Sequence, residues 1–250
     1  MKKRPHIVTI AGFDPSNGAG FTSDIKTFEA LKCYGLAVCT ANTIQDDIEF
    51  HSCYWTPIEV ILEQISLLFK RFDIAYVKIG IVEDWQVLSK IIDRLLKLSP
   101  DIKIILDPVL RSSSNFTFHS TDEAFFDQIL DKIYLLTPNY DEIKQLYSDK
   151  NIEQAIQYIS SKTNLFLKGG HKTDNVGQDT LFTLEGKQFN LNPKSSNCTE
   201  KHGSGCVLSS AITSYLALGF PLLKACYGGK RYTERFLSSN STLLGYHSKN

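Results

Sequence analysis

Apolar and polar positions follow two recurring patterns along this chain. Short apolar runs such as "HIVTIAG" (6–12) and "IKIILDPV" (102–109) are typical of strands buried on both faces of a sheet. Longer segments between them repeat apolar residues every three or four positions, which predicts helices. Because the two patterns alternate, we expect a three-layer α/β/α fold with a mostly parallel central sheet. The expected strands are 6–12, 35–44, 74–81, 102–109, 133–138 and 165–170.

Local signals mark where helices begin and where the sheet ends. Capping boxes are expected at Thr56-Pro57-Ile58-Glu59, with proline at the first helical position, and at Ser120-Thr121-Asp122-Glu123. The segment "LFTLEGKQFNL" (181–191) predicts a hairpin that turns at Glu185-Gly186 and adds an antiparallel edge. No internal repeat or linker-like stretch interrupts the pattern, so we expect a single domain over residues 1–250. The expected apolar helix faces are Leu62, Ile65, Leu68 and Phe69, and Leu88, Ile91, Ile92, Leu95 and Leu96.

The amino-acid composition indicates which kinds of molecule the protein binds. The chain has 27 basic and 27 acidic residues, so no excess of positive charge indicates a nucleic-acid partner. No apolar run approaches the roughly 20 residues that span a bilayer, and the basic start lacks the apolar core of a signal peptide. The six cysteines form no C-x-x-C pair and mostly lie in apolar stretches. We therefore expect a cytoplasmic protein that acts on small molecules, without nucleic-acid or membrane partners.

Candidate site residues follow the strands, because a parallel sheet binds ligands beyond the carboxyl ends of its strands. After the first strand, Gly12, Gly18 and Gly20 leave room for a ligand near the backbone, although glycine content alone favours a plain strand-to-helix connection. Asp107 lies near the end of the fourth expected strand, after "IKIIL", where a carboxylate could hold Mg²⁺. Lys168 ends the sixth, where its amine could pair with phosphate or simply reach solvent.

Two residues after the fifth expected strand have two equally good interpretations. Asn139 and Glu142 could contribute to a magnesium site beside Asp107. Their spacing also fits a capping box that opens the helix "YDEIKQLY".

The segment "EKHGSGCVLSSAITSYLALG" (200–219) places a cysteine where a glycine-rich lead-in becomes a helix. The N-terminus of that helix offers backbone N–H groups and the positive end of the helix dipole, which together favour an anion. A thiol in that field is expected to have a lowered pKa. Cys206 could therefore accept a proton from a substrate hydroxyl while the N–H groups stabilise a transferred phosphoryl group.

Six ordered motifs carry a resemblance to a known family. They are "TIAGFDPSNGAGFTSDIKTFEALKCYG", "KIGIVED", "LDPVL", "LLTPNYDEI", "LKGGH" and "HGSGCVLSSAI", and together they cover nearly the whole chain. In this order they resemble the hydroxymethylpyrimidine/phosphomethylpyrimidine kinases of thiamine biosynthesis. That family is ribokinase-like and is similar to the pyridoxal kinases. The resemblance implies ATP-dependent phosphorylation of 4-amino-5-hydroxymethyl-2-methylpyrimidine to the monophosphate and then to the diphosphate, with ATP and Mg²⁺ required, in a homodimer.

The resemblance also assigns roles to residues. Cys206 is implied as the catalytic base, within an anion hole formed by Gly203, Ser204, Gly205 and Cys206. Asp107 and Glu142 are implied for the metal, and Lys168 and Asn139 for ATP. The residues implied for substrate binding are Gly12, Asp14, Gly18, Ala19, Gly20, Gln45 and Val109.

The chain departs from the family pattern in places that leave alternatives open. Asn17 stands where the family loop has glycine, Lys201 replaces threonine before the histidine, and "RSSSNF" (111–116) replaces the usual lysine and glycine. A pyridoxal kinase would use the same catalytic loop with a different ring pocket. A ligand-binding relative that has lost turnover would be consistent with the altered "RSSSNF" stretch.

Overall fold

The central element of the computed structural model is a nine-stranded sheet, in which the order is β3-β2-β1-β4-β5-β6-β7-β8-β9 within the described residues 3–110, 123–170, 176–195 and 198–247. Neighbouring strands from β2 to β7 are parallel, whereas β3, β8 and β9 pair antiparallel at the two ends. The strands are β1 (His6–Phe13), β2 (Tyr34–Gln45), β3 (Phe50–Trp55), β4 (Ile74–Ile79), β5 (Lys103–Leu106), β6 (Leu135–Leu136), β7 (Asn164–Leu167), β8 (Asp179–Phe182) and β9 (Gln188–Leu191).

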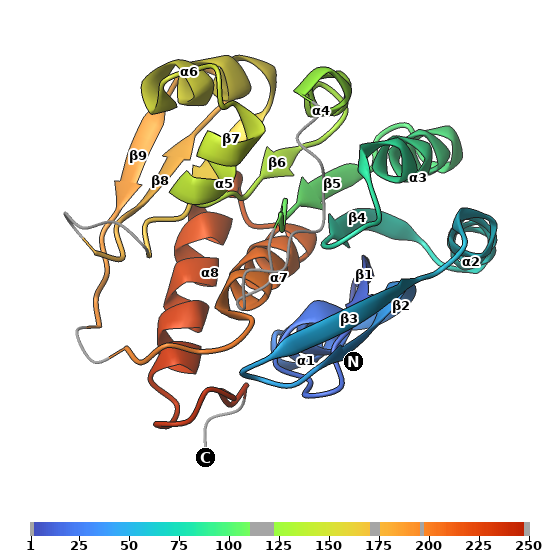
Figure 1. The fold of residues 1–250 in the computed structure, drawn as a ribbon, viewed down its shortest axis with the longest axis horizontal. Coiled ribbons are helices and arrows are strands. Elements are labelled where there is room, and N and C mark those ends of the chain that lie inside the picture. The colour runs from blue at the N-terminus through green and yellow to red at the C-terminus, as the bar shows by residue number, and fades with distance from the viewer. Residues whose placement is uncertain (1–2, 111–122, 171–175, 196–197, 248–250) are drawn as a thin grey trace.

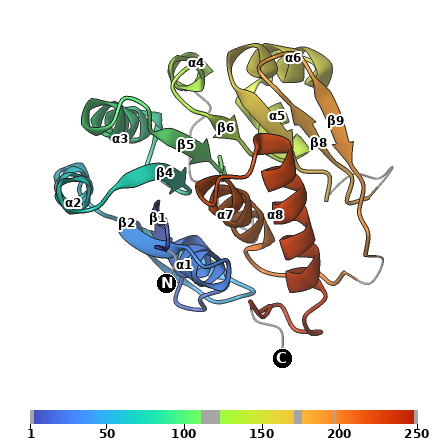
Figure 2. The same ribbon diagram turned by 180° about the vertical axis from the view of Figure 1, so that it is seen from behind.

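Helices cover both faces of the sheet (Figure 1). One layer holds α2 (Ile58–Arg71), α3 (Trp85–Leu98), α4 (Glu123–Leu130), α5 (Tyr140–Leu146) and α6 (Ile152–Lys162). The opposite layer holds α1 (Gly20–Ala30), α7 (Ser204–Ala217) and α8 (Leu222–Leu237), with α7 between the other two (Figure 2). The expected three-layer α/β/α fold with a mostly parallel sheet is therefore confirmed.

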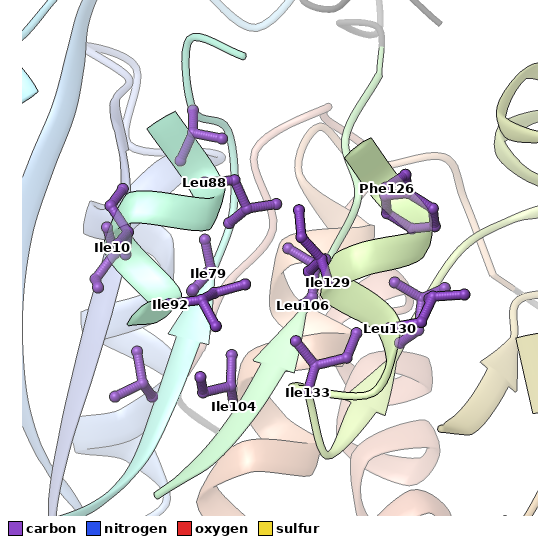
Figure 3. Close-up of a cluster of buried hydrophobic side chains, with 14 of the residues drawn as sticks. Ile10, Ile79, Leu88, Ile92, Ile104, Leu106, Phe126, Ile129, Leu130 and Ile133 are labelled. Atoms are coloured by element: carbon purple, nitrogen blue, oxygen red, sulfur yellow. The ribbon is translucent and has the colours of Figure 1, made fainter. Parts of the chain in front are cut away.

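Alternation along the strands separates two apolar cores. On β5, Ile104 and Leu106 face the layer of α2 to α6, whereas Ile105 faces α7 and α8. The first core is the larger, and its side chains from the sheet interdigitate with those of α3 and α4 (Figure 3). Since buried apolar area is the main stabilising contribution, the strands from β1 to β7 are fixed in place from both sides.

Helix α7 lies in the interior rather than at the surface. Its residues from Val207 to Ser214 are all buried, although the spacing of Leu208, Ala211, Ile212, Tyr215 and Leu216 by itself fits a single apolar face. The polar members of that run therefore face other protein groups, among them the charged residues described below. The helix ends at Ala217, just before Gly219, whose φ of 88° is a conformation that glycine adopts without steric cost.

The other expectations from the sequence have mixed outcomes. All six predicted strands are present, and so is the hairpin of β8 and β9 with Gly186 at its turn. The capping box at Thr56–Glu59 is wrong, because α2 begins at Ile58 and Pro57 occupies the N-cap without a side-chain hydrogen bond. The box at Ser120–Glu123 lies largely outside the described residues. Strand β3 was not predicted, and no helix within the described ranges is long and apolar enough to span a membrane.

The larger core gives a test of the packing. Ile92 of α3 is fully buried, so Ile92→Ala is expected to lower the free energy of unfolding by about 2 to 5 kcal/mol through lost contacts and a cavity. Leu67 of α2 is 68% exposed, and Leu67→Ala should change the free energy by no more than about 0.5 kcal/mol. Urea denaturation of the two variants checks this, and equal losses would contradict the assignment of the core.

Candidate active site

Charged side chains converge where the parallel strands end. Asp107 directly follows β5 and Lys168 directly follows β7, and the Lys168 Nζ lies 2.8 Å from Asp107 Oδ1. Glu142 in the first turn of α5 adds a second carboxylate, 3.5 Å from the same amine. Ser209 of α7 donates a hydrogen bond to Asp107 Oδ2 at 3.1 Å. The structure therefore brings together three residues that the sequence assigned to ATP and the metal.

Burial and charge act against each other within this cluster. Burial alone would raise the pKa of Asp107, but the ammonium groups of Lys168 and Lys78 hold it below its usual range. Burial raises the pKa of Glu142 to about 7, because Lys168 only partly offsets the desolvation and Asp107 adds a like charge. Burial would lower the pKa of Lys168, but the two carboxylates raise it above its usual value. Lys168 is therefore a fixed positive charge at this edge.

The two interpretations of Asn139 and Glu142 are now partly resolved. The capping box is present: the Glu142 N–H donates to Asn139 Oδ1 at 2.8 Å, and the Asn139 N–H donates to Glu142 Oε2 at 2.6 Å. Asn139 also forms a β-bridge with Lys168. The cap orients the Glu142 carboxylate toward Lys168, so a structural role and a role in the site are compatible.

The start of α7 lies directly against the loop that follows β1. Gly203 caps α7 with a φ of 74°, and an added Cβ there would overlap the carbonyl oxygen of Gly18. An added Cβ at Gly18 would in turn overlap the His202 ring. Only glycine permits this approach of two backbones. The Ser204 N–H donates to Lys201 O at 3.3 Å, so Gly205 and Cys206 supply the first-turn N–H groups that lack an acceptor within the helix.

A buried carboxylate ties these two loops together. Asp14 accepts hydrogen bonds from the N–H groups of Ser16 (2.8 Å) and Ala19 (2.7 Å), and its Oδ2 lies 2.9 Å from His202 Nε2. Burial would raise the pKa of Asp14, but these hydrogen bonds bring it below its usual value. Asp14 and Ala19 therefore shape the loop, and contact of either with a substrate stays a prediction.

Cys206 differs from the expectation in its acidity. Burial raises the pKa of Cys206 to about 11, although Lys78 and a hydrogen bond from the Gly20 N–H act in the opposite direction. The prediction of a lowered pKa at this helix start is therefore wrong for the protein without ligands. The cause is desolvation together with the nearby Asp107 and Asp24 carboxylates, which favour the neutral thiol.

The remaining candidates for substrate binding lie at the same edge of the sheet. Gly12 is near the end of β1, Gln45 is the last residue of β2, and Val109 follows β5. Gly20 approaches the carbonyl oxygen of Gly12 so closely that a side chain could not fit there. Their contact with a substrate stays a prediction, and residues 111–116 lie outside the described residues.

Three residues of the site, Ser209, Asp24 and Lys78, were missed in the sequence, and His202 was identified only as the first residue of the motif "HGSGCVLSSAI". His202 and Ser209 hold Asp14 and Asp107, while Asp24 and Lys78 form an ion pair beneath α7. A lysine inside the apolar run "IAYVKIGI" (74–81) is a signal that could have identified the pair, because a charge in a buried strand needs a partner. The partner itself, on α1, could not be found from spacing.

The residues around Asp107 also fit a magnesium ion that is bound mainly by phosphates. Mg²⁺ keeps several waters and takes one or two carboxylates, and Asp107 and Glu142 supply two at this edge. Within the described part of the chain, no group of three or more histidine, cysteine or acidic side chains could form an all-protein metal site. The donor set therefore suits an ion that arrives with a nucleotide.

Comparison with known proteins agrees with this arrangement. Residues 14–249 match the phosphomethylpyrimidine kinase family. A hydroxymethylpyrimidine/phosphomethylpyrimidine kinase from Aquifex aeolicus is 34% identical, with 96% of this chain and 97% of the relative covered. A relative of the same name from Escherichia coli is 30% identical, covering 85% of this chain and 83% of the relative.

Solved structures show the same fold. The phosphomethylpyrimidine kinase from Clostridium difficile superposes with a TM-score of 0.77 at 29% identity, covering 92% of this chain and 98% of that one. A pyridoxal kinase from Staphylococcus aureus in complex with ADP superposes with a TM-score of 0.84 at 21% identity, covering 98% and 94%, a likeness that shows the fold alone. Together with the ordered motifs, the match over residues 14–249 shows that this chain belongs to the phosphomethylpyrimidine kinase family.

Proposed function

We propose that this protein transfers the γ-phosphoryl group of ATP to the hydroxymethyl oxygen of 4-amino-5-hydroxymethyl-2-methylpyrimidine, and then phosphorylates the monophosphate at the same site. The family and the names of its relatives support the first step. The observation that carries the proposal is the position of Gly205, where an added Cβ would lie 3.4 Å from Lys168 Nζ and 4.0 Å from Asp107 Oδ2. An anion-binding helix start and a phosphate-binding lysine thus share one small space.

Each residue then has a defined task. Cys206 accepts the proton of the substrate hydroxyl as the new oxygen–phosphorus bond forms and the bond to ADP breaks. The N–H groups of Gly205 and Cys206 bind the oxygens of the transferred group, and Lys168 balances charge on the ATP phosphates. Asp107 and Glu142 would hold Mg²⁺, which when bound supplies charge stabilisation at the phosphates.

Two alternative functions remain beside the proposed one, and we also propose an oligomeric state and a cellular location. Pyridoxal kinase activity is the second candidate, since a pyridoxal kinase shares the fold over most of both chains. A ligand-binding relative without turnover is the third, and it predicts ring binding with no ADP formed. We propose a homodimer on the basis of the family resemblance, and light scattering would test it. We propose a cytoplasmic location on the basis of the composition.

Acceptor preference and the role of Cys206 can be tested together. With Mg-ATP, we expect ADP release that depends on hydroxymethylpyrimidine and exceeds the release with pyridoxal or with no acceptor. Cys206→Ala should lower kcat by about 10²-fold or more, because the base is lost, while the melting temperature stays nearly unchanged. Full activity of the variant would remove Cys206 from the mechanism, and folded protein that releases no acceptor-dependent ADP would support the binding-protein reading.

The raised pKa of Cys206 predicts a pH dependence. A base must be deprotonated, and below a pKa of about 11 the thiolate fraction grows about tenfold per pH unit. We therefore expect kcat/KM to rise with similar steepness from pH 7.5 to 9.5, a range above the phosphate pKa of about 6. Cys206→Ser should retain little of this slope. A flat profile in the unmodified protein would show that another group, or water, takes the proton.

Lys168 provides a test of the phosphate-binding edge. Lys168→Met should lower kcat/KM for ATP by about tenfold or more, since a desolvated ammonium facing phosphate oxygens is removed. The matched control is Lys162→Met, whose amine pairs with Asp131 at the surface, 3.1 Å away, and should leave kcat/KM nearly unchanged. Steady-state kinetics at varied ATP checks both, with melting curves to confirm folding. Equal effects in the two variants would contradict the assignment.

A further inference from the structure

A second buried ion pair lies beneath α7, away from the cluster around Asp107. Lys78 of β4 and Asp24 of α1 are both fully buried, and the Lys78 Nζ lies 3.0 Å and 2.9 Å from the two Asp24 oxygens. Thr9 of β1 and Ser210 of α7 donate hydrogen bonds to the same carboxylate, at 2.5 Å and 2.7 Å. The pair thus joins the sheet, α1 and α7 at one point.

The lysine extends toward the catalytic edge. An added Cβ at Gly80, which directly follows β4, would lie 3.2 Å from the Lys78 Nζ, so the side chain extends along the strand toward its carboxyl end. Ser210 is one helical turn after Cys206 and shares its face of α7. The ion pair is therefore packed under the helix face that carries Cys206.

Stability alone does not account for this pair. Replacing a buried ion pair with apolar side chains of similar volume is often neutral or stabilising, because desolvation of two charges opposes their attraction. The hydrogen bonds from Thr9 and Ser210 in addition give the Asp24 carboxylate a defined position under α7. The alternative is that the ion pair only holds α7 in place, and an experiment must distinguish this role from an effect on Cys206.

Four charged groups act on or beside the Cys206 thiol from four elements: Lys78 from β4, Asp24 from α1, Asp107 after β5 and Lys168 after β7. After burial, the Lys78 ammonium has the largest effect on the pKa of Cys206, and it lowers that pKa. Asp107 and then Asp24 raise it by less. Of the two members of the pair, the Lys78 ammonium therefore has the larger influence on the thiol, and it favours the thiolate.

We propose that Lys78 and Asp24 are positioning residues for Cys206: Asp24 holds the Lys78 ammonium under the first turn of α7, where it favours the thiolate that accepts the substrate proton. This inference rests on the proposed role of Cys206 as the base. In that role the O–H bond of the substrate breaks, an S–H bond forms, and the Lys78 charge increases the fraction of Cys206 that is present as thiolate.

The test neutralises both members of the pair, because removing one would leave a buried charge unpaired. Lys78→Met with Asp24→Asn is compared with the matched pair Lys230→Met with Asp179→Asn. Lys230 and Asp179 join α8 to β8 with a distance of 2.7 Å and are almost as deeply buried, at 6% and 8% exposed, but neither is among the main groups that shift the pKa of Cys206. If the first double variant does not fold, Lys78→Gln with Asp24→Asn keeps hydrogen bonds without charge.

The first readout needs no kinase activity. Without nucleotide or substrate, alkylation of Cys206 by iodoacetamide is followed by mass spectrometry of its peptide between pH 7.5 and 9.5. Because Lys78 has a larger effect on the thiol than Asp24, loss of the pair should leave less thiolate. The remaining thiolate is more nucleophilic, so an about tenfold smaller thiolate fraction would slow alkylation about threefold. The control pair should leave the rate within experimental error. In turnover, the rising limb of kcat/KM should move up by about one pH unit, with KM for ATP unchanged.

Two outcomes overturn the inference. Folded Lys78/Asp24 variants with normal alkylation of Cys206 would show that the pair only tethers α7, even if their melting temperatures fall. Equal slowing in the control pair would show a general effect of destabilisation. Because alkylation is measured without turnover, slowed alkylation in a protein that lacks kinase activity would support the action of Lys78 on the thiol while the proposed function fails.

Discussion

The site depends on the close contact between the loop after β1 and the start of α7. Gly18 and Gly203 bring two backbones together at a distance that no side chain permits, and Asp14 and His202 fasten them from within. These segments are almost two hundred residues apart in the chain, so the contact joins the first strand to a late helix. Without it, Gly20 could not donate to the Cys206 sulfur, and the first-turn N–H groups of α7 would have no fixed direction.

The sequence predicts the framework well because burial controls it. Strands such as β1 and β5 are continuous apolar runs, and the hairpin of β8 and β9 has a glycine at the turn. Strand β3 was not predicted, since "FHSCYW" alternates only weakly and forms an edge beside β2. The predicted helix start at residues 56–59 is one residue too early, because Pro57 has a non-helical ψ of 137° and takes the N-cap position itself.

The site is predictable in outline but not in its acid–base properties. Asp107 and Lys168 could be placed because both directly follow strands that must end at one edge. The pKa of Cys206 could not be predicted from the sequence. It depends on desolvation and on the charges of Lys78, Asp107 and Asp24, which come from distant parts of the chain. The N-terminus of α7 contributes only part of the electrostatic field at the thiol. Residues outside the glycine-rich motif contribute the rest.

The burial of α7 has a consequence for how the protein is made. Chains emerge from the N-terminus, so the strands that flank the place of α7 are synthesised long before Ser204 to Ala217. Until then the groove that α7 will fill is open, and it is lined in part by Thr9, Asp24, Lys78 and Asp107, which become buried when the helix docks. The enclosure of these charges, and with it the environment of the Cys206 thiol, is therefore completed only by a helix that is synthesised late.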